Sequence, residues 1–153
     1  VSDFLIIPKQ FFTEETIIKR PPLSPTARRA GWIGCNIDIS KVADSGKVFL
    51  VKSSKVINPK IVNHFFNNTL FLREKSAEAR GWILDIMKCI DEIKSETFNL
   101  DEIYKFEQKL KTKYPKNNFI KDKIRQQLQL LRDKGMIEFV GRGNYKKVKY
   151  ANI

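Results

Sequence analysis

The chain has 153 residues, with 29 Lys and Arg against 17 Asp and Glu, and the resulting net charge of +12 favours a nucleic-acid partner. No apolar stretch approaches a membrane-spanning length, and Cys35 and Cys89 stand apart, which excludes a membrane-spanning protein and a cysteine-based metal cluster. Isolated cysteines and the lack of a visible signal peptide fit a reduced compartment, so we expect a cytoplasmic protein without membrane contact.

The N-terminal half alternates short apolar runs with polar or proline-containing breaks. Residues 3–7 predict a buried strand that Pro8 ends, and Thr13 predicts the cap of a short helix over residues 14–18. Asn58 and Pro59 predict the start of a longer helix that runs to about residue 67. The remaining expectations are an irregular segment over residues 21–31 and strands over 33–39 and 47–52.

The C-terminal half predicts three amphipathic helices and a hairpin. A polar stretch over residues 73–79 predicts a boundary between a domain at 1–76 and a domain at 77–153. Asn99 is expected to cap the second helix and Asn118 the third, which Gly135 ends. The expected buried positions are Ile83, Ile86, Met87, Ile90 and Ile93 in the first helix, Ile103, Phe106 and Leu110 in the second, and Ile120, Ile124, Gln127, Leu128 and Leu131 in the third.

A hairpin follows the third helix. Strands are expected over residues 136–140 and 145–150, around a glycine-containing turn at 141–144. Helices that end in a two-stranded ribbon with a basic tip are typical of a winged helix. The sequence therefore predicts an α+β protein whose C-terminal domain is a winged helix.

The outward face of the third helix carries the residues expected to contact DNA. Arg and Gln can read base edges in a major groove, whereas Lys and Arg neutralise phosphates. The alternative is a solvated helix face of mixed charge. The candidate residues in and around this domain are Asn117, Asn118, Lys121, Arg125, Gln126, Gln129, Arg142 and Lys146.

A second candidate contact lies in the proline-containing segment. Trp32 follows Gly31 and the basic pair Arg28 and Arg29, and an indole in such a loop is suited to insertion into a nucleic-acid groove. The alternative is a tryptophan that anchors the loop in the core. Trp82, at the start of the first C-terminal helix, is expected to pack in the core.

The residues suggest no catalytic centre. His64 has no acid, serine or cysteine pattern around it, and the pair Glu14 and Glu15 suits a helix start. A metal nuclease needs carboxylates and a lysine on adjacent strands. The spacing Glu-x-Lys occurs at 92–94 and 107–109, on expected helices, where we interpret both as surface pairs.

Several blocks resemble the DpnI-type methyl-directed restriction endonucleases. They are SPTARRAGWIGCNID at residues 24–38, KDKIRQQLQLLRDK at 121–134 and GRG at 141–143, supported by shorter matches near the N-terminus and over 58–73. The resemblance implies a C-terminal piece of a restriction-endonuclease-like PD-(D/E)XK domain followed by a winged helix. It also implies recognition of double-stranded GATC DNA that carries N6-methyladenine, by both domains, with Trp32 as the methyl sensor of the first.

The resemblance leaves out the catalytic part of that family. Its acids, its lysine and its zinc-binding cysteines precede the first strand of this chain, so we expect Mg²⁺ to act in the full-length family enzyme and none to be bound here. The chain could be a fragment of a longer enzyme or a separately encoded binding protein, and we expect a monomer. The alternatives are a winged-helix transcriptional regulator that binds operator DNA and, less favoured, an RNA-binding module.

Overall fold

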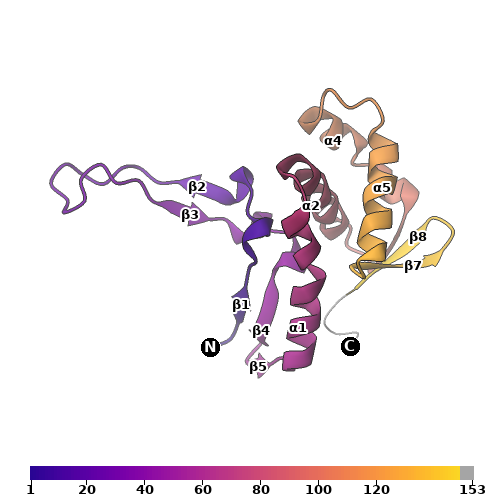
Figure 1. The fold of residues 1–153 in the computed structure, drawn as a ribbon, viewed down its shortest axis with the longest axis horizontal. Coiled ribbons are helices and arrows are strands. Elements are labelled where there is room, and N and C mark those ends of the chain that lie inside the picture. The colour runs from indigo at the N-terminus through magenta and orange to yellow at the C-terminus, as the bar shows by residue number, and fades with distance from the viewer. Residues whose placement is uncertain (149–153) are drawn as a thin grey trace.

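A computed structural model describes residues 1–148 of the chain (Figure 1). The N-terminal half holds five short strands and one helix, and the C-terminal half holds four helices and three strands. The protein is therefore α+β, as predicted. Short 3₁₀ turns join the elements of the N-terminal half, at Lys9–Phe11, Glu14–Thr16, Ile39–Lys41, Asp44–Gly46 and Leu70–Glu74.

The first sheet is antiparallel, with the strand order β1-β4-β5. β1 spans Phe4–Ile6, β4 Val48–Lys52 and β5 Lys55–Val56, and helix α1 (Pro59–Asn68) packs on β4. Asn58 caps α1 by accepting a hydrogen bond from the Lys60 amide at 2.9 Å, which confirms the predicted helix start. The predicted burial of the first strand is wrong, because Phe4 is 55% exposed and Ile6 43% exposed.

The second sheet is the base of a long hairpin, which we call the arm (residues 17–37). Strands β2 (Ile17–Lys19) and β3 (Cys35–Ile37) pair antiparallel, and Figure 1 shows the arm projecting away from the helices. The predicted helix over 14–18 is wrong beyond its first turn. The Thr16 amide donates to the Thr13 carbonyl at 3.0 Å and closes a 3₁₀ turn, and Thr16 Oγ1 accepts the Thr13 amide at 3.0 Å. The β-branched pair Ile17 and Ile18 then enters the sheet.

The C-terminal half has the helix and strand order of a winged helix. Its helices are α2 (Ala77–Glu92), α3 (Leu100–Tyr104), α4 (Glu107–Lys113) and α5 (Ile120–Asp133). A third sheet with the order β6-β8-β7 joins β6 (Thr97–Asn99), β7 (Ile137–Gly141) and β8 (Asn144–Lys147). The predicted hairpin thus gains a third strand, β6. Lys149 and Tyr150 of the predicted last strand lie outside the described residues.

Two details of the predicted helices need correction. The expected second helix is divided at Lys105 and Phe106 into α3 and α4, although Asn99 caps it as predicted, with Glu102 completing a capping box. Asn118 does not cap α5: its Oδ1 accepts a hydrogen bond from Lys111, and Phe119 precedes the first turn. The cap position of α5 is therefore Phe119, one residue later than predicted, and no side chain caps the helix.

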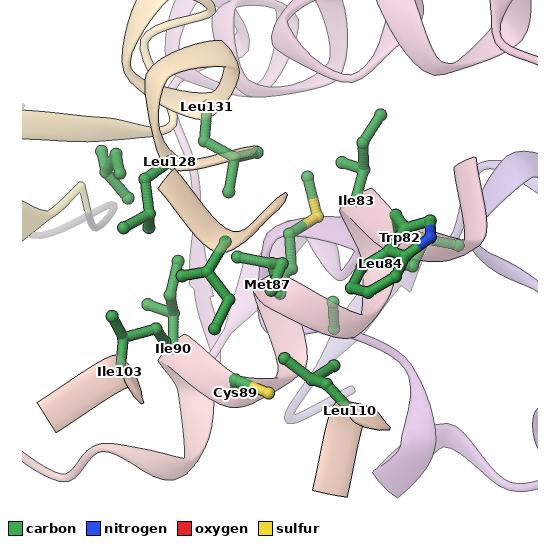
Figure 2. Packing of buried hydrophobic residues seen from close by; sticks show 14 of the residues in the cluster. Trp82, Ile83, Leu84, Met87, Cys89, Ile90, Ile103, Leu110, Leu128 and Leu131 are labelled. Carbon is green, nitrogen blue, oxygen red and sulfur yellow. The ribbon is translucent and has the colours of Figure 1, made fainter. Parts of the chain in front are cut away.

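One hydrophobic core joins the two halves. Figure 2 shows buried side chains of α2 packed against those of α3, α4 and α5. Phe11, Val42 and Leu72 from the N-terminal half belong to the same cluster. The domain boundary after residue 76 stays a prediction. The predicted core positions that are buried are Ile83, Ile86, Met87, Ile90, Ile103, Leu110, Ile120, Ile124, Gln127, Leu128 and Leu131, while Ile93 and Phe106 are partly buried.

Asp91 connects the two halves through the backbone. Its Oδ2 accepts a hydrogen bond from the Asp44 amide at 2.8 Å. Burial raises the pKa of the Asp91 carboxyl to about 6, so the folded protein holds the proton more tightly than the unfolded chain does. This contribution to stability is fully present below about pH 4 and is lost as the pH rises to about 6.

We expect Asp91→Asn to remove this part of the pH dependence. The amide oxygen can still accept the Asp44 hydrogen bond without a buried charge, so the variant should be more stable than wild type at pH 7 by about 1–2 kcal/mol. Urea denaturation at pH 4 and pH 7 measures the difference, with Asp101→Asn at an exposed site as the control. Equal losses of stability between these pH values in wild type and Asp91→Asn would contradict the prediction.

Candidate nucleic-acid interface

Helix α5 presents a polar face outward because its apolar residues recur at helical spacing. Ile124 and Leu128 are completely buried, whereas Arg125, Gln126 and Gln129 on the other side are exposed. The exposure expected for the three residues is confirmed. Their role in reading bases stays a prediction.

Cations of α5 form exposed ion pairs with nearby carboxylates. Arg125 pairs with Asp122, one turn earlier, and this hydrogen bond raises the pKa of the guanidinium. Lys121 Nζ lies 3.5 Å from Glu107 and 5.3 Å from the centroid of the Tyr104 ring. Pairs this exposed contribute little to stability, so each cation can exchange its carboxylate for a phosphate or a base edge at small cost.

The hairpin β7–β8 forms a wing beside α5, which contacts β7 (Figure 1). Arg142 is exposed in its turn, where Asn144 Nδ2 donates to the Arg142 carbonyl at 3.0 Å. Gly143 adopts a φ of +71°, a conformation that side chains disfavour. Lys146 lies on the central strand β8, opposite Glu138 of β7 and Thr97 of β6. The wing thus places Arg142 at its tip and Lys146 farther back.

The arm carries the other predicted contacts. Trp32 is 53% exposed, so the alternative of a core tryptophan is not supported. Its indole lies on Gly34, where a Cβ would approach the ring carbon Cζ3 to 2.8 Å. Hydrogen bonds from the Leu23 amide to the Trp32 carbonyl (2.9 Å) and from the Arg20 amide to the Gly34 carbonyl (3.0 Å) fix this part of the arm. Arg28 and Arg29 are exposed in the loop that precedes Trp32.

The structure does not bring the two sets of predicted contacts together. In Figure 1 the loop of the arm lies at one end of the molecule's long axis, and α5 and the wing lie toward the other end. Arg125, Gln126, Gln129 and Arg142 belong to the surface of α5 and the wing. Trp32, Arg28 and Arg29 form a separate surface on the arm.

The segment between α4 and α5 holds an exposed aromatic residue that the sequence did not single out. Phe119 is 71% exposed, immediately before α5. Asn117 Oδ1 accepts the Phe119 amide at 2.7 Å, and Lys111 donates to Asn118 at 3.0 Å. The signal in the sequence was a Phe that falls off the apolar stripe of the following helix. Asn117 and Asn118, predicted as DNA contacts, serve in this fold as hydrogen-bond acceptors for the loop.

The described residues provide no donor set for a metal. Among residues 1–148, no three His, Cys, Asp or Glu side chains come together as ligands would. The magnesium ion that the resemblance implies stays an expectation for the full-length family enzyme. None of the described helices is long and apolar enough to cross a membrane.

Comparison with protein-family models gives two matches in sequence. Residues 1–75 match the model of the Dam-replacing family, and residues 78–147 match that of the Dam-replacing helix-turn-helix (HTH) domain. Both models describe parts of DpnI-type proteins. The HTH match spans α2 to β8, where the winged helix lies. An HTH domain is a DNA-binding domain, and its recognition helix enters the major groove. The chain therefore belongs to the DpnI-type Dam-replacing family and ends in that family's DNA-binding HTH domain.

Proposed function

We propose that this chain recognises double-stranded GATC DNA carrying N6-methyladenine, as the recognition part of a methyl-directed restriction endonuclease. In this proposal α5 lies in the major groove and reads base edges, while Arg142 and Lys146 of the wing contact phosphates. Arg28, Arg29 and Trp32 make a second contact from the arm. Mg²⁺ would act with the family's catalytic residues and not with the residues described here.

One observation carries the methyl-specific part of the proposal. Trp32 offers an exposed apolar ring that is seated on Gly34 and flanked by arginines of the arm. Two adenine methyl groups lie close together in the major groove of a fully methylated GATC site, and a flat ring can cover them. Burial of one methyl group contributes about 0.8 kcal/mol, roughly a fourfold change in affinity. Displaced water or steric exclusion must add to this for strong discrimination.

We expect Trp32→Ala to narrow the preference for methylated over unmethylated duplex by about fourfold for each methyl group covered. Titration of both duplexes with the full chain measures the ratio of the two affinities. Gly34→Ala should narrow it as well, because the new Cβ displaces the indole without removing it. Arg125→Ala is the comparison variant and should weaken binding to both duplexes alike, by about 1–3 kcal/mol, because it removes a contact to a base edge.

Two outcomes would count against the proposal. Equal affinity of the wild type for both duplexes would favour an operator-binding regulator over a methyl-directed enzyme. An unchanged ratio in a folded Trp32→Ala variant would place methyl sensing outside the arm.

A further inference from the structure

Phe119 exposes an aromatic ring beside the face of α5 assigned to base reading. At 71% it is more exposed than any other Phe or Trp that the structure describes. Single exposed apolar residues are common on protein surfaces, so exposure alone assigns no role. The role of Phe119 is argued from the residues that surround its ring.

The backbone on both sides of Phe119 is held in place. Lys111 Nζ donates to the carbonyls of Pro115 (3.0 Å) and Asn117 (2.7 Å) and to Asn118 Oδ1 (3.0 Å). The Phe119 amide donates to Asn117 Oδ1 at 2.7 Å, and its carbonyl accepts from the Lys123 amide at 3.0 Å. The ring is thus presented by an ordered segment, which lowers the entropy lost when it is covered by a partner.

A hollow of about 590 Å³ adjoins the ring. Its lining combines two lysines, three side-chain amides, one carboxylate and a single aromatic ring. Gln126, one of the residues assigned to base edges, borders the same hollow as Phe119. The full lining is Lys116, Asn117, Asn118, Phe119, Asp122, Lys123 and Gln126. Cations suit phosphates, amides suit base edges, and the ring suits an apolar group among them.

Resting on the proposed function, we infer that Phe119 is the apolar contact of the winged helix with a methyl group on a base edge in the major groove. A methyl group is the apolar feature that a base edge offers there. In a GATC site it comes from thymine C5 or from methylated adenine N6. Phe119 would therefore add a specificity contact separate from Trp32, which lies on the arm.

The test measures binding of the full chain to four duplexes. They carry or lack the adenine methyl group, and they contain either thymine or deoxyuridine, which lacks the C5 methyl group. Phe119→Ala should lose about fourfold in affinity for each methyl group contacted, and should lose nothing on the duplex without that methyl group. Phe119→Leu should retain most of the contact. Val56→Ala, at an 80% exposed site on β5, is the control.

The pattern of losses decides the source of the methyl group. A loss that vanishes on deoxyuridine duplexes assigns thymine, and a loss that vanishes on unmethylated duplexes assigns N6-methyladenine. Both results support the inference. Equal loss on all four duplexes, or no loss on any duplex that the wild type binds, overturns it while the proposed function stands. Failure of the wild type to bind any duplex overturns both.

Discussion

Raising the salt concentration from 50 to 200 mM should weaken binding of the full chain to duplex DNA about a thousandfold. The expectation comes from about six phosphate contacts, which give a slope near −5 for log K against log salt. The cations expected to supply them lie on α5 and the wing and include Lys121, Arg132, Arg142 and Lys146. All four lie in the segment from Lys105 onward, where 14 basic residues face 4 acidic ones.

Variants of single cations locate the contact. Arg142→Gln at the tip of the wing should reduce the salt slope by about 1, because one phosphate loses its partner. Lys55→Gln, on the exposed strand β5 of the N-terminal sheet, is the matched control and should leave the slope unchanged. Titrations at four salt concentrations measure both. A slope near zero in the wild type would exclude α5 and the wing as the binding surface.

The sequence predicted α5 well because its signals are local. The apolar positions Ile120, Ile124 and Leu131 repeat at helical spacing, and Gly135 ends the helix with a φ of +72°. Strand β6 was missed for the opposite reason. Of its three residues only Phe98 is buried, and Phe98 pairs with Tyr145, which lies far along the chain. A run this short has no periodicity of its own.

The arm shows where local signals mislead. Glu14 and Glu15 after Thr13 have the pattern of a helix start, and the structure does form one turn there. Ile17 then pairs with Ile37 across the base of the arm, and this distant partner overrides a further helical turn. The segment over residues 21–31 was expected to be irregular, but the projection of the arm away from the core could not be predicted from its residues.

The candidate site was predicted only in part. The outward residues of α5 followed from helix geometry, since a buried stripe fixes which positions face water. The ordered loop before α5 did not follow, because it depends on Lys111 reaching three acceptors at 115–118. Phe119 was overlooked for the same reason. The packing of the two halves on one core could not be predicted either, because Phe11 and Val42 lie far from α2 in sequence.

Trp82→Ala should destabilise the folded protein by about 3–5 kcal/mol, the range for removal of a large buried aromatic side chain. Trp82 is 3% exposed and stacks on Tyr114, with ring centroids 3.8 Å apart and planes at 16° (Figure 2 labels Trp82). Lys123 Nζ lies 5.8 Å from the centroid of the indole ring. The substitution would therefore leave a cavity between α2 and the segment that leads into α5.

The loss extends beyond the indole because its stacking partner anchors a polar network. The Tyr114 hydroxyl donates to Asp85 at 2.5 Å, and Lys113 bridges Asp85 (2.7 Å) and Glu15 (2.8 Å) of the N-terminal half. Urea denaturation measures the change, with Trp32→Ala as the matched control. The control should shift stability by less than about 1 kcal/mol, because its indole is exposed. A loss of about 3–5 kcal/mol would be a large part of the stability of a small protein, which is about 5–15 kcal/mol. A loss of that size in both variants would mean that the indole of Trp32 is also a core residue, contrary to its assignment as a DNA contact.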